Sequence, residues 1–328
     1  MSKHKLGTID AANTLITELY IELRRKVNRW ASITHQTAQA RMGYVGQHLV
    51  SVVTGFTGGR SGARGKDLLL GKDKYAEIKT CYRVDQLGKC NSCGAVIASI
   101  EDTCPECGSS DVKRNDDSKW LIGIRNDDEF STILDPEYYF LVLFDFTDLA
   151  NPDTIRASVY RVDSLTPGFA YCMVDYYCNI RSKSKSKAPY NLWPFQLKFD
   201  LMRPLLIYRS LIGSDDTITT EIFPGRDKNQ LFNLRPMSDY ARAKNLTTSS
   251  LEDVARRFKV IGGRAAFTRS ELLTVIEEKV RPLVCADLFI DVLAHTMYMP
   301  VIRKHIAKLP APLKGRIKDI IARVEKSH

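Results

Sequence analysis

The first fifty residues place apolar side chains at helical spacing, followed by a cluster of glycines. The spacing predicts an amphipathic helix over residues 10–31 with Asp10 as its N-cap. Its apolar stripe would be Ile16, Tyr20, Leu23, Val27 and Trp30. A second helix is expected over residues 37–53. Five glycines within residues 55–65 then end that helix and predict a flexible loop.

Short apolar or alternating runs, typical of strands, come next. We expect strands at residues 66–70, 74–80, 120–124, 138–146 and 157–162. The run Tyr138–Phe146 is apolar almost throughout, as a strand covered on both faces would be, so it should lie centrally in a sheet. The turn-rich segment between the second and third strands, residues 89–117, is expected to be an insertion into that sheet.

The last third of the chain returns to helical periodicity. Two capping boxes, Ser249 with Glu252 and Thr268 with Glu271, mark the starts of helices. Helices are expected at residues 251–258, 269–280, 283–298 and 313–324. The first two favour plain helical packing; a helix-turn-helix is the alternative, because a glycine-containing turn joins them.

Charge adds a partner to this outline. The 328 residues include 48 basic and 38 acidic side chains, a net charge of +10 with a pI near 9.1, which favours a polyanion, nucleic acid above all. A membrane surface would need a basic amphipathic helix or a lipidation signal, and neither is evident. The longest apolar stretch is too short to span a bilayer and no signal peptide is evident, so we expect a cytoplasmic protein without membrane contact.

Two groups of basic residues are candidates for contacts with DNA phosphates. The first lies in the glycine-rich loop: Arg60, Arg64 and Lys66. The second alternates with serines: Arg181, Lys183, Lys185 and Lys187. A solvated loop is the alternative interpretation of the second group.

Four of the eight cysteines form two C-x-x-C-G motifs, Cys90 with Cys93 and Cys104 with Cys107. Each motif brings two sulfurs to one ion, and the glycine that follows permits the tight turn. The spacing predicts a closed, structural Zn²⁺ site in a ribbon too small for its own apolar core. A redox dithiol is the alternative on the same spacing.

A hairpin at residues 65–80 carries the candidate chemistry. If Gly71, Lys72 and Asp73 form a three-residue loop, Asp67 faces Glu77 across the two strands. Lys79 then lies on the same face, while the other face carries Leu68, Leu70, Ala76 and Ile78. Two opposed carboxylates favour a divalent cation such as Mg²⁺ between them, and with a nearby ammonium this can hydrolyse a phosphodiester.

An ordinary explanation exists for these residues too. Asp67 can be a strand-end residue, and Glu77 with Lys79 an ion pair on a solvated sheet surface. The glycine-rich basic loop before the hairpin, the buried strand after it and the basic charge favour the catalytic interpretation.

The segment 43–80, a helix, a glycine-rich loop, Asp67 and then Glu77-Ile78-Lys79, resembles the core of PD-(D/E)XK nucleases, type II restriction endonucleases in particular. The resemblance implies Mg²⁺ ligation by Asp67, Glu77 and the carbonyl of Ile78, with Lys79 assisting the attacking water. It is specific over some forty residues and suggestive through residue 162.

Two positions depart from the family pattern. Lys66 stands where the family has a proline, and Gln47 stands where many members carry a helical glutamate. Glu18 or Glu22 from the first helix are the possible substitutes, although Glu22 can instead pair with Lys26.

Together these observations predict an α/β fold: a restriction-endonuclease-like mixed sheet flanked by helices, a zinc-ribbon insertion and a helical C-terminal region. The expected parts are N-terminal helices at 1–54, a nuclease core at 55–170 with the ribbon at 88–116, a mixed strand and loop region with the basic loop at 171–245, and a DNA-binding or dimerising helical region at 246–328.

The expected function is Mg²⁺-dependent cleavage of double-stranded DNA at a specific sequence by a homodimer, with a cognate DNA methyltransferase as cellular partner. A resolvase, repair or modification-dependent nuclease with the same core is one alternative. A zinc-ribbon DNA-binding regulator without enzymatic activity is the other.

Overall fold

The computed structural model divides the chain into two compact units. It describes residues 5–36, 38, 40, 42–59, 66–82, 84, 87–98, 103–113, 120–146, 154–183, 190–191, 199, 201–224, 248–263, 266–286 and 290–326. The first unit comprises Met1–Trp120, Tyr139–Arg161 and Leu206–Gln230, and the second comprises Leu121–Tyr138, Val162–Leu205 and Leu231–His328.

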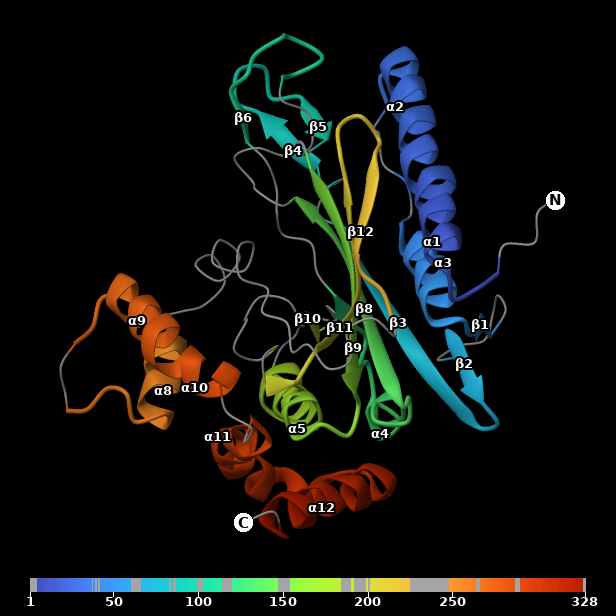
Figure 1. The fold of residues 1–328 in the computed structure, drawn as a ribbon. Coiled ribbons are helices and arrows are strands. Elements are labelled where there is room, and N and C mark those ends of the chain that lie inside the picture. The colour runs from blue at the N-terminus through green and yellow to red at the C-terminus, as the bar shows by residue number, and fades with distance from the viewer. Residues whose placement is uncertain are drawn as a thin grey trace. The chain divides into compact units, whose positions relative to one another are not determined.

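A seven-stranded sheet is the centre of the first unit (Figure 1). Its order is β1-β2-β3-β8-β9-β11-β12. The strands span Thr57–Gly58 (β1), Leu68–Gly71 (β2), Lys74–Tyr82 (β3), Tyr138–Phe146 (β8), Ile155–Asp163 (β9), Leu205–Ile212 (β11) and Ile218–Ile222 (β12). Strand β8 is buried at every residue after its first and has three strands on either side, so the prediction that it is central is confirmed.

Helices from the N-terminal end of the chain cover part of this sheet. They are α1 (Ile9–Leu15), the π-helical η1 (Ile16–Ile21), α2 (Glu22–Thr34) and α3 (Gly43–Thr54). The ring of Tyr20 packs against Tyr82 of β3 and Phe144 of β8, with centroids 5.8 and 5.1 Å away. This aromatic cluster fixes η1 on the central strands, and the predicted sheet flanked by helices is confirmed.

The N-terminal helices differ from the prediction in three details. Thr8, not Asp10, is the N-cap, because its side chain accepts a hydrogen bond from the backbone of Ala11. Only Ile16 and Tyr20 of the apolar stripe are buried, and Trp30 is 56% exposed. The second helix begins at Gly43, six residues later than expected.

A buried ion pair lies between the central strands. Asp145 of β8 accepts two hydrogen bonds from Arg156 of β9, at 2.9 and 2.6 Å, and both side chains are buried. Beside them, Trp120 donates to the carbonyl of Val142 at 2.7 Å and contacts the ring of Tyr160. These polar contacts satisfy groups that would otherwise be costly to bury.

The cysteine segment forms a separate three-stranded sheet in the order β5-β4-β6. Its strands are Leu87–Cys90 (β4), Val96–Ala98 (β5) and Val112–Lys113 (β6). Its apolar cluster is small: Cys90, Ile97 and Cys104 with Ala95 and Val112. In the chain it lies between β3 and β8, which are neighbours in the main sheet, as the predicted insertion requires.

The second unit is mainly helical. Its elements are β7 (Leu121–Ile122), α4 (Asp127–Ser131), α5 (Pro167–Asp175), η2 (Tyr176–Ile180), η3 (Arg181–Lys183), β10 (Tyr190–Asn191), α8 (Thr248–Arg257), α9 (Arg269–Val275), η4 (Ile276–Val280), α10 (Arg281–Ala286), α11 (Ile290–His305), η5 (Ile306–Lys308) and α12 (Ala311–Lys326). Helix α5 is buried and packs against α11 and α12. The predicted capping box of Thr268 and Glu271 is present.

One expectation for this unit is wrong. The strand predicted at residues 120–124 is only β7, which pairs with β10 in a two-stranded sheet and not with the main sheet. The span 283–298, predicted as a helix, is helical where it is described, in α10 up to Ala286 and in α11 from Ile290, and residues 287–289 lie outside the described residues. None of the described helices is long and apolar enough to cross a bilayer.

Candidate active site and metal centre

The hairpin of β2 and β3 has the predicted register but a different turn. Leu68 pairs with Ala76 as expected, yet Gly71 pairs with Lys74, so the turn holds only two residues, Lys72 and Asp73. A bulge between Leu69 and Gly71 adds one residue to β2 and restores the register that a two-residue turn alone would shift. The predicted three-residue loop is therefore wrong, while the predicted pairing of Leu68 with Ala76 is present.

The left-handed backbone conformation of the turn suits its residues. Asp73 has φ of +61° and Gly71 has φ of +149°. Aspartate is among the few non-glycine residues that adopt positive φ readily, and glycine does so without steric cost. The tight turn is consequently encoded locally, although the bulge beside it is not.

Asp67 is held in place by hydrogen bonds to both of its oxygens. Gln47 of α3 donates from Nε2 to Oδ1 at 3.0 Å, and the backbone N–H of Ile78 in β3 donates to Oδ2 at 2.8 Å. Each oxygen keeps further lone pairs for other ligands. The resemblance placed Gln47 on the helix that precedes the first acid of the motif. Gln47 does lie on that helix, α3, and it contacts this acid, Asp67.

Glu77 and Lys79 complete the cluster from β3. Their side chains form an ion pair through Glu77 Oε1 and Lys79 Nζ. The side chain of Glu77 is 17% exposed and that of Lys79 is 24% exposed. The pair is therefore largely shielded from water, where electrostatic interactions are stronger than on an open surface.

The second carboxylate oxygen of Glu77 is buried and has no hydrogen-bond partner among the described residues. Burial raises the pKa of Glu77, the Lys79 ammonium lowers it, and the nearby Asp67 carboxylate raises it further. A buried, unpartnered carboxylate oxygen beside a second carboxylate fits a hard divalent cation, which prefers oxygen ligands. Asp67 and Glu77 could hold Mg²⁺ here.

The residues considered as a third acid do not supply one. Glu18 is exposed. Oε2 of Glu22 lies 3.4 Å from Nζ of Lys26, so Glu22 forms the ion pair that was its alternative interpretation. Among the described residues, the only group of three or more His, Cys, Asp or Glu side chains arranged for a metal is the set of four cysteines. Gln47, an amide, stands at the helical position for which the resemblance implied a glutamate.

Gly46, which sequence reasoning did not single out, permits the approach of α3 to β3. A Cβ atom at Gly46 would lie 2.0 Å from Oγ1 of Thr80, closer than any real contact. The glycine therefore lets α3 pack tightly enough for Gln47 to reach Asp67. A lone glycine in an apolar helix carried no signal of this role.

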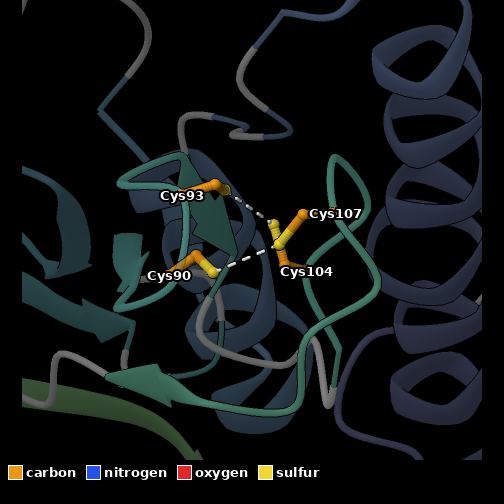
Figure 2. A group of neighbouring side chains, drawn as sticks. All are labelled: Cys90, Cys93, Cys104 and Cys107. Atoms are coloured by element: carbon orange, nitrogen blue, oxygen red, sulfur yellow. Dashed lines mark hydrogen bonds between the residues drawn. The ribbon is translucent and has the colours of Figure 1, made fainter.

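The four predicted zinc ligands converge on one point, as Figure 2 shows. Their sulfur atoms all lie within 4.8 Å of one another, with Cys90 to Cys107 and Cys93 to Cys104 both at 3.6 Å. A tetrahedral site with Zn–S bonds of about 2.3 Å places sulfurs about 3.8 Å apart. The cluster therefore has the dimensions of a four-thiolate zinc site.

The two C-x-x-C-G motifs share one backbone geometry. Gly94 donates to the carbonyl of Cys90 at 3.0 Å, and Gly108 donates to that of Cys104 at 2.8 Å. Both glycines have positive φ, +78° and +70°, as the sequence predicted for the tight turns.

The four thiols lie close enough to change one another's pKa. The backbone N–H of Cys93 is the largest influence that lowers the pKa of Cys90, to about 6. At Cys107 the N–H of Ser109 lowers the pKa, but the neighbouring sulfur of Cys93 and burial raise it to about 12. Thiolates crowded in this way need a cation to neutralise them, which Zn²⁺ would supply.

The predicted DNA contacts are only partly within the described residues. Lys66 is exposed, with Nζ 5.5 Å from the centre of the Tyr75 ring. Arg181 is half-buried and Lys183 is exposed, both in η3 of the second unit. The other candidates lie outside the described residues: Arg60, Arg64, Lys185 and Lys187.

Comparison with known proteins gives one match. A family model described as MamI restriction endonuclease matches residues 29–238, which is 210 of the 328 residues. The matched range includes the hairpin, the four cysteines and the main sheet, and it ends before α8. No curated protein and no solved structure matches the chain.

Proposed function

This chain belongs to the MamI restriction endonuclease family, and on that premise we propose that Asp67, Glu77 and Lys79 are the site at which it hydrolyses DNA. The chain is thus a DNA endonuclease. One observation carries the assignment: the buried Oε2 of Glu77 has no hydrogen-bond partner among the described residues, and it lies beside the Asp67 carboxylate and next to the ion-paired Lys79.

The residues of the hairpin have distinct roles in this proposal. A bound Mg²⁺ would lower the pKa of a coordinated water and offset negative charge on the phosphate. Asp67 and Glu77 hold the cation, together with the carbonyl of Ile78 that the family resemblance implies. Gln47 orients Asp67 by donating to Oδ1, so the other oxygen stays against the backbone of β3.

Lys79 acts on the substrate side. Its ammonium is anchored by Glu77 and retains N–H donors for a phosphate oxygen or the attacking water. In a partly shielded site such a cation stabilises the charge that develops on the phosphate in the transition state. It also limits the repulsion between the two acids before substrate arrives.

The finer parts of the function follow from the chemistry of restriction. We propose a type II enzyme that cuts double-stranded DNA at a specific sequence in the cytoplasm. A cognate DNA methyltransferase would protect the cell's own DNA from cleavage. Two strands of opposite polarity are most simply cut by two copies of one site related by a two-fold axis, which favours a homodimer. The four-cysteine site would hold structural Zn²⁺, because four protein ligands leave no position open for water.

Plasmid cleavage with matched variants tests the assignment. We expect wild-type protein to cut plasmid DNA with Mg²⁺ and to lose activity with EDTA. Glu77→Gln and Asp67→Asn should each lower the cleavage rate by at least about 10²-fold, the usual cost of removing one group that stabilises the transition state. Both substitutions keep the size of the side chain.

Asp73→Asn is the control variant. Asp73 is an exposed acid in the turn of the same hairpin, and asparagine also tolerates its positive φ. It should cut like wild type. If Glu77→Gln cuts as fast as Asp73→Asn, the active site lies elsewhere; if wild-type protein binds DNA but never cuts, the chain acts as a regulator.

A further inference from the structure

Two segments of the second unit that are far apart in the sequence together form a basic surface. One is the short helix η3, which follows η2, and the other is the end of α11 with η5. Asn179 of η2 joins them, because its Oδ1 lies 3.0 Å from Nε2 of His305. Asn179 is itself fixed by donating to Asp175 at 2.8 Å.

Three lysines surround this junction: Lys183, Lys304 and Lys308, which we call the lysine cluster. All three are exposed. Lys304 adjoins His305 in the chain and Lys308 ends η5 three residues later, while Lys183 ends η3, four residues after Asn179. Burial lowers the pKa of His305, the charges of Lys304, Lys308 and Lys183 lower it further, and the Asp175 carboxylate raises it.

Within the described residues, no acidic side chain pairs with any member of the lysine cluster. Other cations of this unit are used structurally: Arg316 pairs with Asp135, and Arg323 donates to the carbonyl of Leu165. In the part of this unit that the structure describes, Lys183, Lys304 and Lys308 form no contact of this kind. The three positive charges outnumber the one carboxylate, Asp175, that acts on His305, and this excess of positive charge favours a polyanion as the partner.

We propose that the lysine cluster binds the phosphate backbone of DNA, as a contact surface separate from the hydrolytic residues. The inference rests on DNA being the substrate of the enzyme, as its family establishes. DNA is the occupant favoured by charge, because compact ammonium groups bind phosphate oxygens as point charges without base specificity. Lys304 and Lys308 lie beyond the residues that the family model matches.

The salt dependence of DNA binding tests this surface. Equilibrium binding of full-length protein to a duplex is measured in EDTA, so the result does not depend on cleavage. The variant is Lys183→Gln/Lys304→Gln/Lys308→Gln. Each lost phosphate contact should reduce the slope of log K against log salt by about 0.9, up to about 2.7 for three. Affinity should fall at least tenfold, equally for specific and unrelated sequences.

A control with the same change in charge removes three other exposed lysines of this unit, Lys279→Gln/Lys318→Gln/Lys326→Gln. It should keep the wild-type slope. The melting temperature of the lysine-cluster variant should not fall, because the cluster supports no described contact of the fold. Unchanged affinity and slope in this variant, or an equal loss in the control, would overturn the proposal whether or not Glu77 is catalytic.

Discussion

The substitution Gly46→Ala tests how the packing of α3 on β3 supports the candidate site. The added Cβ would lie 2.0 Å from Oγ1, 2.9 Å from Cγ2 and 3.0 Å from Cβ of Thr80. Favourable carbon contacts lie at about 3.5–4.0 Å. Rotating the Thr80 side chain cannot relieve the contact to its own Cβ, so α3 must move outward by roughly 0.5 Å or more.

The cost follows from two opposing effects. Overpacking of this kind destabilises by about 1–3 kcal/mol, while alanine in place of glycine favours a helix by up to about 1 kcal/mol. With the middle of the first range and the full helix gain, the net loss is about 1 kcal/mol, a fall of roughly 2–4 °C in melting temperature. Because Gln47 is the next residue and bonds to Asp67 at 3.0 Å, cleavage should slow by about tenfold or more.

Gly43→Ala is the matched control in the same helix. A Cβ at Gly43 would meet nothing within 4 Å, so this variant should be as stable as wild type or slightly more so, with normal cleavage. Thr80→Ala removes Oγ1 and Cγ2, the two closest atoms, but keeps Cβ, so it should recover part of the stability and cleavage that Gly46→Ala loses. Each variant is assayed by thermal melting and by initial rates on plasmid DNA.

Two results would refute this reasoning. One is a Gly46→Ala variant with the stability and activity of Gly43→Ala, which would mean that the helix has room for the methyl group. The other is a double variant no better than Gly46→Ala alone, which would mean that Thr80 is not the group that clashes.

Three further predictions concern the interior and the ribbon. Purified protein should carry about one Zn²⁺ per chain by elemental analysis, and Cys93→Ser should lose it, since three thiolates no longer close the site; full zinc content in the variant would contradict this. Trp120→Phe should lower the free energy of unfolding in urea by about 1–3 kcal/mol, because it leaves the buried carbonyl of Val142 without its donor. Asp145→Ala should cost about 3–5 kcal/mol by leaving Arg156 buried and unpaired, and adding Arg156→Met should recover much of that loss; if it does not, the charge is not the cause.

Local chemistry made much of this molecule predictable from its sequence. The C-x-x-C-G motifs place their sulfurs through short turns, so spacing alone predicted the cluster that the structure contains. The continuous apolar run of β8 likewise predicted a strand that is buried on both faces. The pairing of Leu68 with Ala76 was also predictable, because alternation along two short strands is a local property.

Other features depend on contacts between distant segments, which no local pattern records. The bulge in β2 was missed because its effect is to restore a register that a three-residue loop would also produce. The role of Gly46 arises only where α3 meets Thr80, and the lysine cluster exists only because Asn179 and His305, 126 residues apart in the chain, bond to each other. Periodicity and turn residues depend on the backbone within a few residues. Which segments pack together depends on the burial of whole helix and sheet faces, and only the folded chain determines these contacts.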